Sequence, residues 1–102
     1  MTVWSRRPNP VFSDEYQLLR ETLSEARQQA GMTQRGLARC LGKSNSHVSQ
    51  IETGQRRVDT LEFYLIARSI GVEPVELFES VARKLDRLTL EAESEAPAGA
   101  AD

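Results

Sequence analysis

The sequence predicts an all-α fold of five helices in one small domain, with an extended arm before them and an acidic tail after them. Apolar residues recur at the three- and four-residue spacing of amphipathic helices from residue 14 to residue 88. Residues that cap helix starts precede these segments, and glycines that end helices follow most of them. The chain has 102 residues, of which 39% are hydrophobic, and this suffices for a single modest core.

The chain begins with an expected arm at residues 1–12, which contain two prolines and show no helical periodicity. A first helix is expected at residues 14–30, because Ser13 can cap its first turn and Gly31 can end it. The inward face of this helix is expected to consist of Leu19, Leu23, Ala26 and Ala30.

Two short helices joined by a tight turn are expected next, at residues 34–41 and 45–53. Thr33 and Ser44 supply the capping hydroxyls, and Gly42 suits the left-handed conformation that ends a helix. This pattern predicts a helix-turn-helix. The residues expected to face inward are Leu37, Ala38, Leu41, Val48 and Ile51.

Residues 33–54, with the sequence TQRGLARCLGKSNSHVSQIETG, resemble the helix-turn-helix of the Cro and phage-repressor family, also called the XRE family. The resemblance covers about residues 16–78. It implies a five-helix, repressor-like helix-turn-helix domain. It also implies a sequence-specific transcriptional regulator of double-stranded DNA, of bacterial or phage origin, which is cytoplasmic and associated with the nucleoid.

A fourth helix is expected at about residues 61–70, capped by Asp59 or Thr60 and ended by Gly71. Its apolar residues are Leu61, Leu65, Ile66 and Ile70.

The fifth helix is expected to open at Pro74 and to extend beyond the usual end of the family domain, near Phe78. Residues 13–90 would then form the domain, and residues 91–102 a disordered acidic tail. The apolar stripe of the fifth helix consists of Leu77, Phe78, Val81, Leu85 and Leu88.

Polar side chains on the third helix are the candidates for reading bases, because the N-terminal part of a recognition helix faces the base edges. Asn and Gln can each bind adenine through two hydrogen bonds, and Ser can serve several bases. On an isolated helix such residues would be read as ordinary surface residues, but within this motif we favour base contacts. The candidates are Asn45, Ser46, Ser49 and Gln50.

Phosphate contacts are expected from residues that flank the third helix. Gln34 matches the family's glutamine at the start of the second helix, which resembles a phosphate clamp. His47 could equally be a neutral surface imidazole. The full set of candidates is Gln34, Arg35, Lys43, Ser44, His47, Arg56 and Arg57.

The resemblance also implies a structural ion pair between Arg27 on the first helix and Glu52 at the end of the third. The pair would lock the two helices together and would have no catalytic role.

The formal net charge of −2 hides an asymmetry along the chain. Residues 1–72 carry ten Lys and Arg against seven Asp and Glu, a net charge of +3, whereas residues 73–102 carry −5. The local field at the binding face decides DNA affinity more than the overall charge does, so an acidic protein can still bind DNA there.

A homodimer on a palindromic operator, most simply acting as a repressor, is expected because one recognition helix covers too few base pairs to compete with non-specific sites. The fifth-helix stripe is the candidate interface, although it could instead fold back on its own core. In the arm, Trp4 and Phe12 could clasp the partner, or Arg6 and Arg7 could reach a minor groove. We favour the clasp.

The alternative function is that of an antitoxin, whose C-terminal segment binds a toxin and which autoregulates its operon. An enzyme is not expected, because the chain has one His and no nucleophile motif or phosphate loop. No cofactor, metal, membrane segment or small-molecule ligand is expected. Cys40, the single cysteine, is read as a packing residue.

Overall fold

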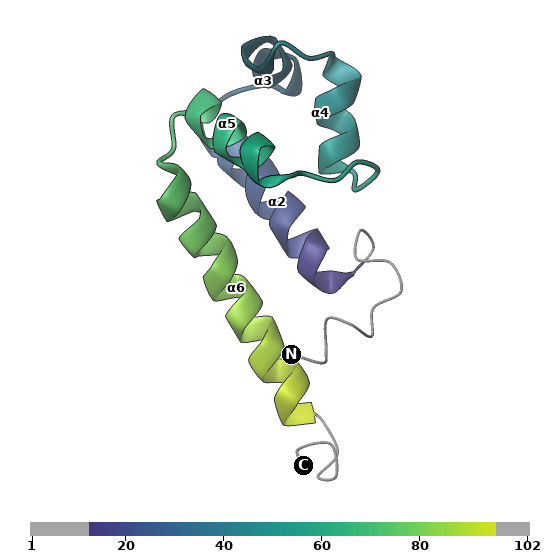
Figure 1. Ribbon diagram of the computed structural model, residues 1–102, viewed down its shortest axis with the longest axis vertical. Coiled ribbons are helices and arrows are strands. Elements are labelled where there is room, and N and C mark those ends of the chain that lie inside the picture. The colour runs from purple at the N-terminus through teal and green to yellow at the C-terminus, as the bar shows by residue number, and fades with distance from the viewer. Residues whose placement is uncertain (1–12, 96–102) are drawn as a thin grey trace.

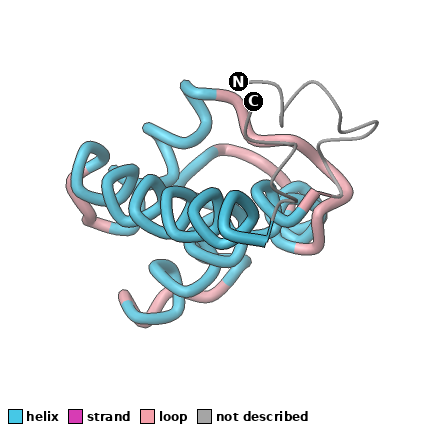
Figure 2. The backbone as a smooth tube through the Cα atoms, turned by 90° about the horizontal axis from the view of Figure 1, so that it is seen from below, coloured by secondary structure: helices cyan, strands magenta, loops and turns pink. Residues whose placement is uncertain are grey.

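The computed structural model describes the backbone of residues 13–95 and the side chains of residues 13–91. The expected arm at residues 1–12, with Trp4, Arg6, Arg7 and Phe12, lies outside the described residues, as do residues 96–102. The described chain forms five helices with loops between them, which confirms the predicted all-α fold (Figures 1 and 2). These helices are α2 (Asp14–Gln29), α3 (Gln34–Leu41), α4 (Asn45–Glu52), α5 (Thr60–Ile70) and α6 (Pro74–Glu95).

Side-chain caps fix where four of the helices begin. The hydroxyls of Ser13, Thr33 and Ser44 each accept a hydrogen bond from a backbone N–H in the first turn of α2, α3 and α4. Asp59, rather than Thr60, caps α5.

The turn between α3 and α4 depends on Gly42, which ends α3 in the left-handed region at φ 69°. The N–H of Lys43 then donates to the carbonyl of Ala38 over 2.9 Å, which closes the helix end. Ala38 is buried at this point, so α3 and α4 approach each other closely.

The core lies where α2, α3, α4 and α5 meet, and α6 adds its first turn to it (Figure 1). Ala30 is an exception to the expected inward face of the first helix: it is the exposed C-cap of α2. The buried core consists of Leu23, Leu37, Ala38, Val48, Ile51, Ile66, Ala67, Ile70 and Leu77.

Helix α6 is longer than predicted. It continues to Glu95, so residues 91–95, assigned from sequence to a disordered tail, are helical. Leu90, Glu91 and Ala92 are good helix formers, and the next helix-breaking residue is Pro97, which explains the extension.

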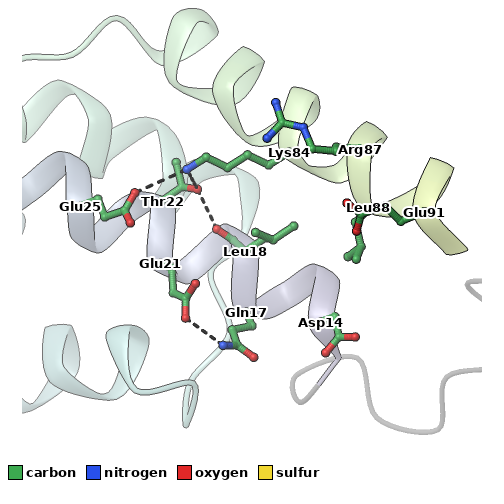
Figure 3. A pocket seen from close by; sticks show the side chains of 10 residues that line it. All are labelled: Asp14, Gln17, Leu18, Glu21, Thr22, Glu25, Lys84, Arg87, Leu88 and Glu91. Carbon is green, nitrogen blue, oxygen red and sulfur yellow. Dashed lines mark hydrogen bonds and ion pairs between the residues drawn. The ribbon is translucent and has the colours of Figure 1, made fainter.

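The distal part of α6 packs beside α2 and forms one wall of an open groove of about 450 Å³ (Figure 3). Lys84 crosses between the helices: its Nζ donates to Thr22 Oγ1 over 2.9 Å and lies 3.5 Å from a carboxylate oxygen of Glu25. Leu88 lines the same groove opposite Leu18. The far half of α6 is therefore attached to its own domain.

Candidate nucleic-acid interface

Helix α4 has one face buried and the other turned to solvent. Val48 and Ile51 are 1% and 2% exposed, and they hold the helix against the core. The opposite edge carries the predicted base-reading residues: Asn45, Ser46 and Gln50 are exposed and Ser49 is half-buried. The helix lies at the side of the molecule, away from α6 (Figure 1). This edge is therefore free to approach another molecule.

Basic residues flank the exposed edge of α4 on both sides. Arg35, on α3, and Lys43, in the turn, are exposed, and so are Arg56 and Arg57 in the connector that follows α4. Ser44 is exposed as well, and its hydroxyl already accepts the backbone N–H of His47 as the α4 cap. Lys43 and Ser44 thus lie in the turn before α4, Arg56 and Arg57 lie in the connector after it, and Arg35 lies on α3.

Arg27 and Glu52 form a buried ion pair between α2 and the end of α4. The Arg27 Nε lies 2.6 Å from one carboxylate oxygen and its second terminal nitrogen lies 3.0 Å from the other. The two side chains are 10% and 9% exposed. A pair with this two-pronged geometry fixes orientation as well as distance.

Two further side chains complete the surroundings of Glu52. Gln34 Nε2 donates to Glu52 Oε1 over 3.0 Å, and Ser24 Oγ donates to the same oxygen over 3.2 Å. Burial by itself raises the pKa of the Glu52 carboxyl, but hydrogen bonds from Arg27 and Gln34 outweigh burial and hold the pKa below its usual value. Gln34, predicted as a phosphate clamp, thus uses one amide N–H to hold Glu52 at the end of α4.

His47 is directed toward α5 and not toward solvent. Its Nε2 lies 3.1 Å from Glu62 Oε2, and its side chain is 12% exposed. A terminal nitrogen of Arg56 lies 3.7 Å from the same carboxylate oxygen. We therefore remove His47 from the phosphate candidates, because its ring nitrogen joins α4 to α5. In the sequence, Asp59 and Glu62 have the spacing of a capping box, which places Glu62 in the first turn of α5. This spacing was the available sign that Glu62 would be near α4.

Tyr16 and Arg20 contact the end of α4 and its connector, and the sequence did not identify them. Arg20 donates to the Glu52 carbonyl over 2.9 Å, and the Tyr16 hydroxyl accepts the Val58 N–H over 2.6 Å. Burial raises the pKa of the Tyr16 phenol, although the Val58 hydrogen bond acts in the opposite direction. The one indication in the sequence is that Tyr16 and Arg20 are four residues apart on α2, which places them on the same face of the helix.

The predicted dimer stripe of α6 is divided by the fold. Leu77 and Val81 are buried in the domain's own interior, and Leu85 and Leu88 are half-buried against α2. Phe78 alone of this set is more than half exposed, and its ring stacks edge-on against Phe63 of α5. Leu77 and Val81 are therefore not accessible to a partner, and Leu85 and Leu88 are only partly exposed.

Another apolar surface is exposed where α5 and the start of α6 adjoin. A shallow groove of about 490 Å³ lies there, lined among others by Tyr64, Val75 and Phe78. Leu61 and Leu65 share the exposed face of α5 with Tyr64, at the three- and four-residue spacing of neighbours on a helix. We call this set the α5–α6 patch: Leu61, Tyr64, Leu65, Val75 and Phe78.

Within the described part of the chain, no helix is long and apolar enough to span a membrane. Among the same residues, no group of three or more His, Cys, Asp or Glu could hold a metal ion.

Comparisons with known proteins agree with this geometry. A helix-turn-helix family model matches residues 23–77. An XRE-family like protein from Pseudomonas syringae pv. tomato str. DC3000 is 41% identical, with 69% of this chain and 85% of that chain covered and a TM-score of 0.65. The restriction-modification controller protein C.AhdI from Aeromonas hydrophila is 32% identical, with coverages of 64% and 99% and a TM-score of 0.56.

A variant of a second restriction-modification controller protein, C.Esp1396I, is 25% identical, covers 72% of this chain and 97% of its own, and has a TM-score of 0.67. A comparison with curated protein sequences gives no match. The family match spans more than half of the chain and includes α3 and α4 with their exposed edge. The chain belongs to the helix-turn-helix family of Cro-like and XRE-like DNA-binding transcriptional regulators.

Proposed function

We propose that the protein is a dimeric repressor that binds a palindromic operator with α4 in the major groove. The observation that carries this proposal is the polar edge of α4, which is exposed, flanked by basic residues and held rigidly by the buried opposite face. A helix with this arrangement can enter a major groove without rearranging the domain. Similarity to proteins named as restriction-modification controllers supports a regulatory role.

Base reading is assigned to the exposed edge of α4. Asn45 and Gln50 stand at its two ends, and each amide can bind adenine through two hydrogen bonds. Ser46 and Ser49 lie between them and make supporting contacts. Each good two-bond contact discriminates against a wrong base by about 1–3 kcal/mol.

Phosphate binding is assigned to the basic residues around that edge. Lys43 and Arg57 flank α4 at its two ends, and Arg35 extends the positive surface along α3. Arg56 contributes while its guanidinium also lies near Glu62. Ser44 and Gln34 add neutral donors, since the Gln34 amide has a second N–H besides the one bound to Glu52. These contacts give affinity without sequence preference.

Dimerisation is assigned to the α5–α6 patch in place of the α6 stripe. Val75 is 74% exposed and lines the groove together with Tyr64 and Phe78, and Leu61 on the same helix as Tyr64 is 65% exposed. Exposed apolar side chains gathered in this way mark interaction surfaces. A two-fold contact through this patch would bury the same residues on both subunits. It would also leave α4 of each subunit uncovered, because α4 lies outside the patch.

The test is selection of binding sites from a random duplex pool by the purified full chain, followed by footprinting. We expect two inverted half-sites with centres about 34–36 Å apart, one turn of the double helix. Gln50→Ala should relax base preference at one position in each half-site. Arg57→Ala should weaken binding to all duplexes alike and reduce the slope of log K against log salt by about one.

Unchanged specificity of Gln50→Ala would refute the assignment of α4 as the reading helix. Arg83→Ala is the matched control for Arg57→Ala, because Arg83 is an exposed arginine on α6, and it should leave the salt slope unchanged. The antitoxin alternative would be favoured by a toxin-like reading frame adjacent to the gene and by a stable complex with its product.

A further inference from the structure

One face of α2 follows the chain from the end of α4 through the connector to α5. Tyr16, Arg20, Ser24 and Arg27 are spaced by four, four and three residues, so they line one side of the helix. Ser24 and Arg27 hold the side chain of Glu52, and Arg20 holds its backbone carbonyl. Tyr16 is the first residue of this row, and it contacts the connector at Arg56 and Val58.

The Tyr16 hydroxyl makes two hydrogen bonds to the connector backbone. It accepts the N–H of Val58 over 2.6 Å and donates to the carbonyl of Arg56 over 3.4 Å. These two groups lie on either side of Arg57, which is exposed. A single side-chain oxygen therefore fixes the peptide groups before and after the arginine.

The start of the connector is fixed by a second contact from the same face. Gly54 has φ 84°, and a Cβ placed there would lie 2.9 Å from Arg20 Nε. The glycine thus permits both the left-handed backbone and the close approach of Arg20, which donates to the Glu52 carbonyl. The connector is held at its beginning by Arg20 and at its end by Tyr16.

We propose that Tyr16 is a positioning residue for DNA binding: its hydroxyl fixes the connector backbone so that Arg57 and Arg56 are presented to the DNA phosphates in a preset geometry. This inference rests on the proposed function, because it requires the connector to contact phosphate. A loop that is ordered before binding loses less conformational freedom on binding, so its contacts yield more affinity. Tyr16 itself need not touch DNA.

The decisive variant is Tyr16→Phe, which removes the hydroxyl and keeps the aromatic ring of a residue that lines a small apolar cavity with Leu19, Phe78 and Leu85. Ser80→Ala is the control for loss of a hydroxyl, because Ser80 is a half-buried serine on α6 that lies outside both the connector and the α5–α6 patch. Each variant is compared with wild type for duplex affinity, thermal stability and exchange of the Val58 amide proton.

We expect Tyr16→Phe to weaken binding about threefold to tenfold, the loss that corresponds to one net hydrogen bond. The factor should be the same for a duplex selected by wild type and for a mixed-sequence duplex, because phosphate contacts carry no sequence information. Exchange of the Val58 amide should accelerate. Ser80→Ala should leave all three readouts unchanged.

The variant is also combined with Arg57→Ala. If Tyr16 acts by presenting Arg57, the effect of Tyr16→Phe on affinity should largely disappear in the Arg57→Ala background. An equal effect in both backgrounds, or an unchanged affinity of Tyr16→Phe, would overturn the proposal. If the wild-type protein bound no duplex at all, the proposed DNA-binding function would be wrong. The role of Tyr16 would then be wrong as well, because it depends on that function. If the wild-type protein binds DNA and Tyr16→Phe binds it with the same affinity, only the positioning role of Tyr16 is wrong.

Discussion

Glu52 is the residue at which α2, α3 and α4 are joined. Its carboxylate receives hydrogen bonds from Arg27 and Ser24 of α2 and from Gln34 of α3, and its carbonyl receives one from Arg20. Removal of one partner from a buried ion pair leaves the other charge buried and unpaired, which costs about 3–5 kcal/mol. The orientation of α4 therefore depends strongly on this one carboxylate.

The lowered pKa of Glu52 predicts how stability should change with pH. A carboxyl whose pKa is lower in the folded state contributes stability that is present above its unfolded pKa, about 4.3, and is lost as pH falls through the folded pKa. We expect the free energy of unfolding to fall as the pH drops below about 5, and to fall less steeply in Glu52→Gln. Chemical denaturation at a series of pH values checks this.

Glu52→Gln should also be less stable than wild type at pH 7, because Arg27 then lacks its charged partner. The matched control is Glu79→Gln, since Glu79 forms an exposed pair with Arg83 on α6. That variant should retain both the stability and the pH dependence of wild type. Identical pH profiles for wild type and Glu52→Gln would contradict the assigned role of Glu52.

At the scale of the element, the start of α5 couples a helix cap to α4. Asp59 accepts the N–H of Glu62 over 2.7 Å, and Glu62 accepts the N–H of Asp59 over 3.3 Å, which together form a capping box. The other carboxylate oxygen of Glu62 lies beside His47 of α4. The cap thus positions Glu62, the partner of His47 on α4.

Asp59→Ala should lower the free energy of unfolding by about 0.5–2 kcal/mol, because the first turn of α5 loses its side-chain acceptor. Asp59→Asn should stay close to wild type, since Asn caps helices as well as Asp does. Urea denaturation of the three proteins checks the prediction. A loss in Asp59→Asn equal to that in Asp59→Ala would show that the charge and not the cap is responsible.

The bounds of α3 and α4 could be predicted from sequence because their signals are local. Thr33, Gly42 and Ser44 act on backbone groups within a few residues of themselves, so their effect does not depend on the rest of the fold. The Arg27–Glu52 contact followed only from family resemblance. Tyr16 and Val58 are 42 residues apart, and no local rule places that hydroxyl at that amide.

At the scale of the whole molecule, the sequence identified an apolar stripe on α6 but not what covers it. Periodicity shows that one face of a helix is apolar, but it does not say whether the chain itself or a partner buries that face. Leu77 and Val81 pack into the domain, and Leu85 and Leu88 lie against α2. The outward residues of α5 could not be recognised as exposed until the position of α6 was known.

The α5–α6 patch predicts a specific change in oligomeric state. Val75→Asp should convert a dimer to a monomer, because it places a charge in the apolar contact while an acidic residue remains acceptable in the first turn of α6. Leu90→Asp is the matched control, since Leu90 is 65% exposed on distal α6, and it should remain dimeric. Sedimentation equilibrium distinguishes the two. If Leu90→Asp dissociated the dimer and Val75→Asp did not, the interface would lie on distal α6 and not in the α5–α6 patch.

The attachments of α4 have a consequence for how such a regulator can diversify. The side chains that hold this helix, among them Glu52, His47, Val48 and Ile51, all point away from its exposed edge. Asn45, Ser46 and Gln50 can therefore be exchanged for other polar residues while every anchoring contact stays in place. With the base-reading role proposed above, new operator preferences can evolve on this scaffold by substitution at three surface positions, without passing through an unfolded or misassembled ancestor.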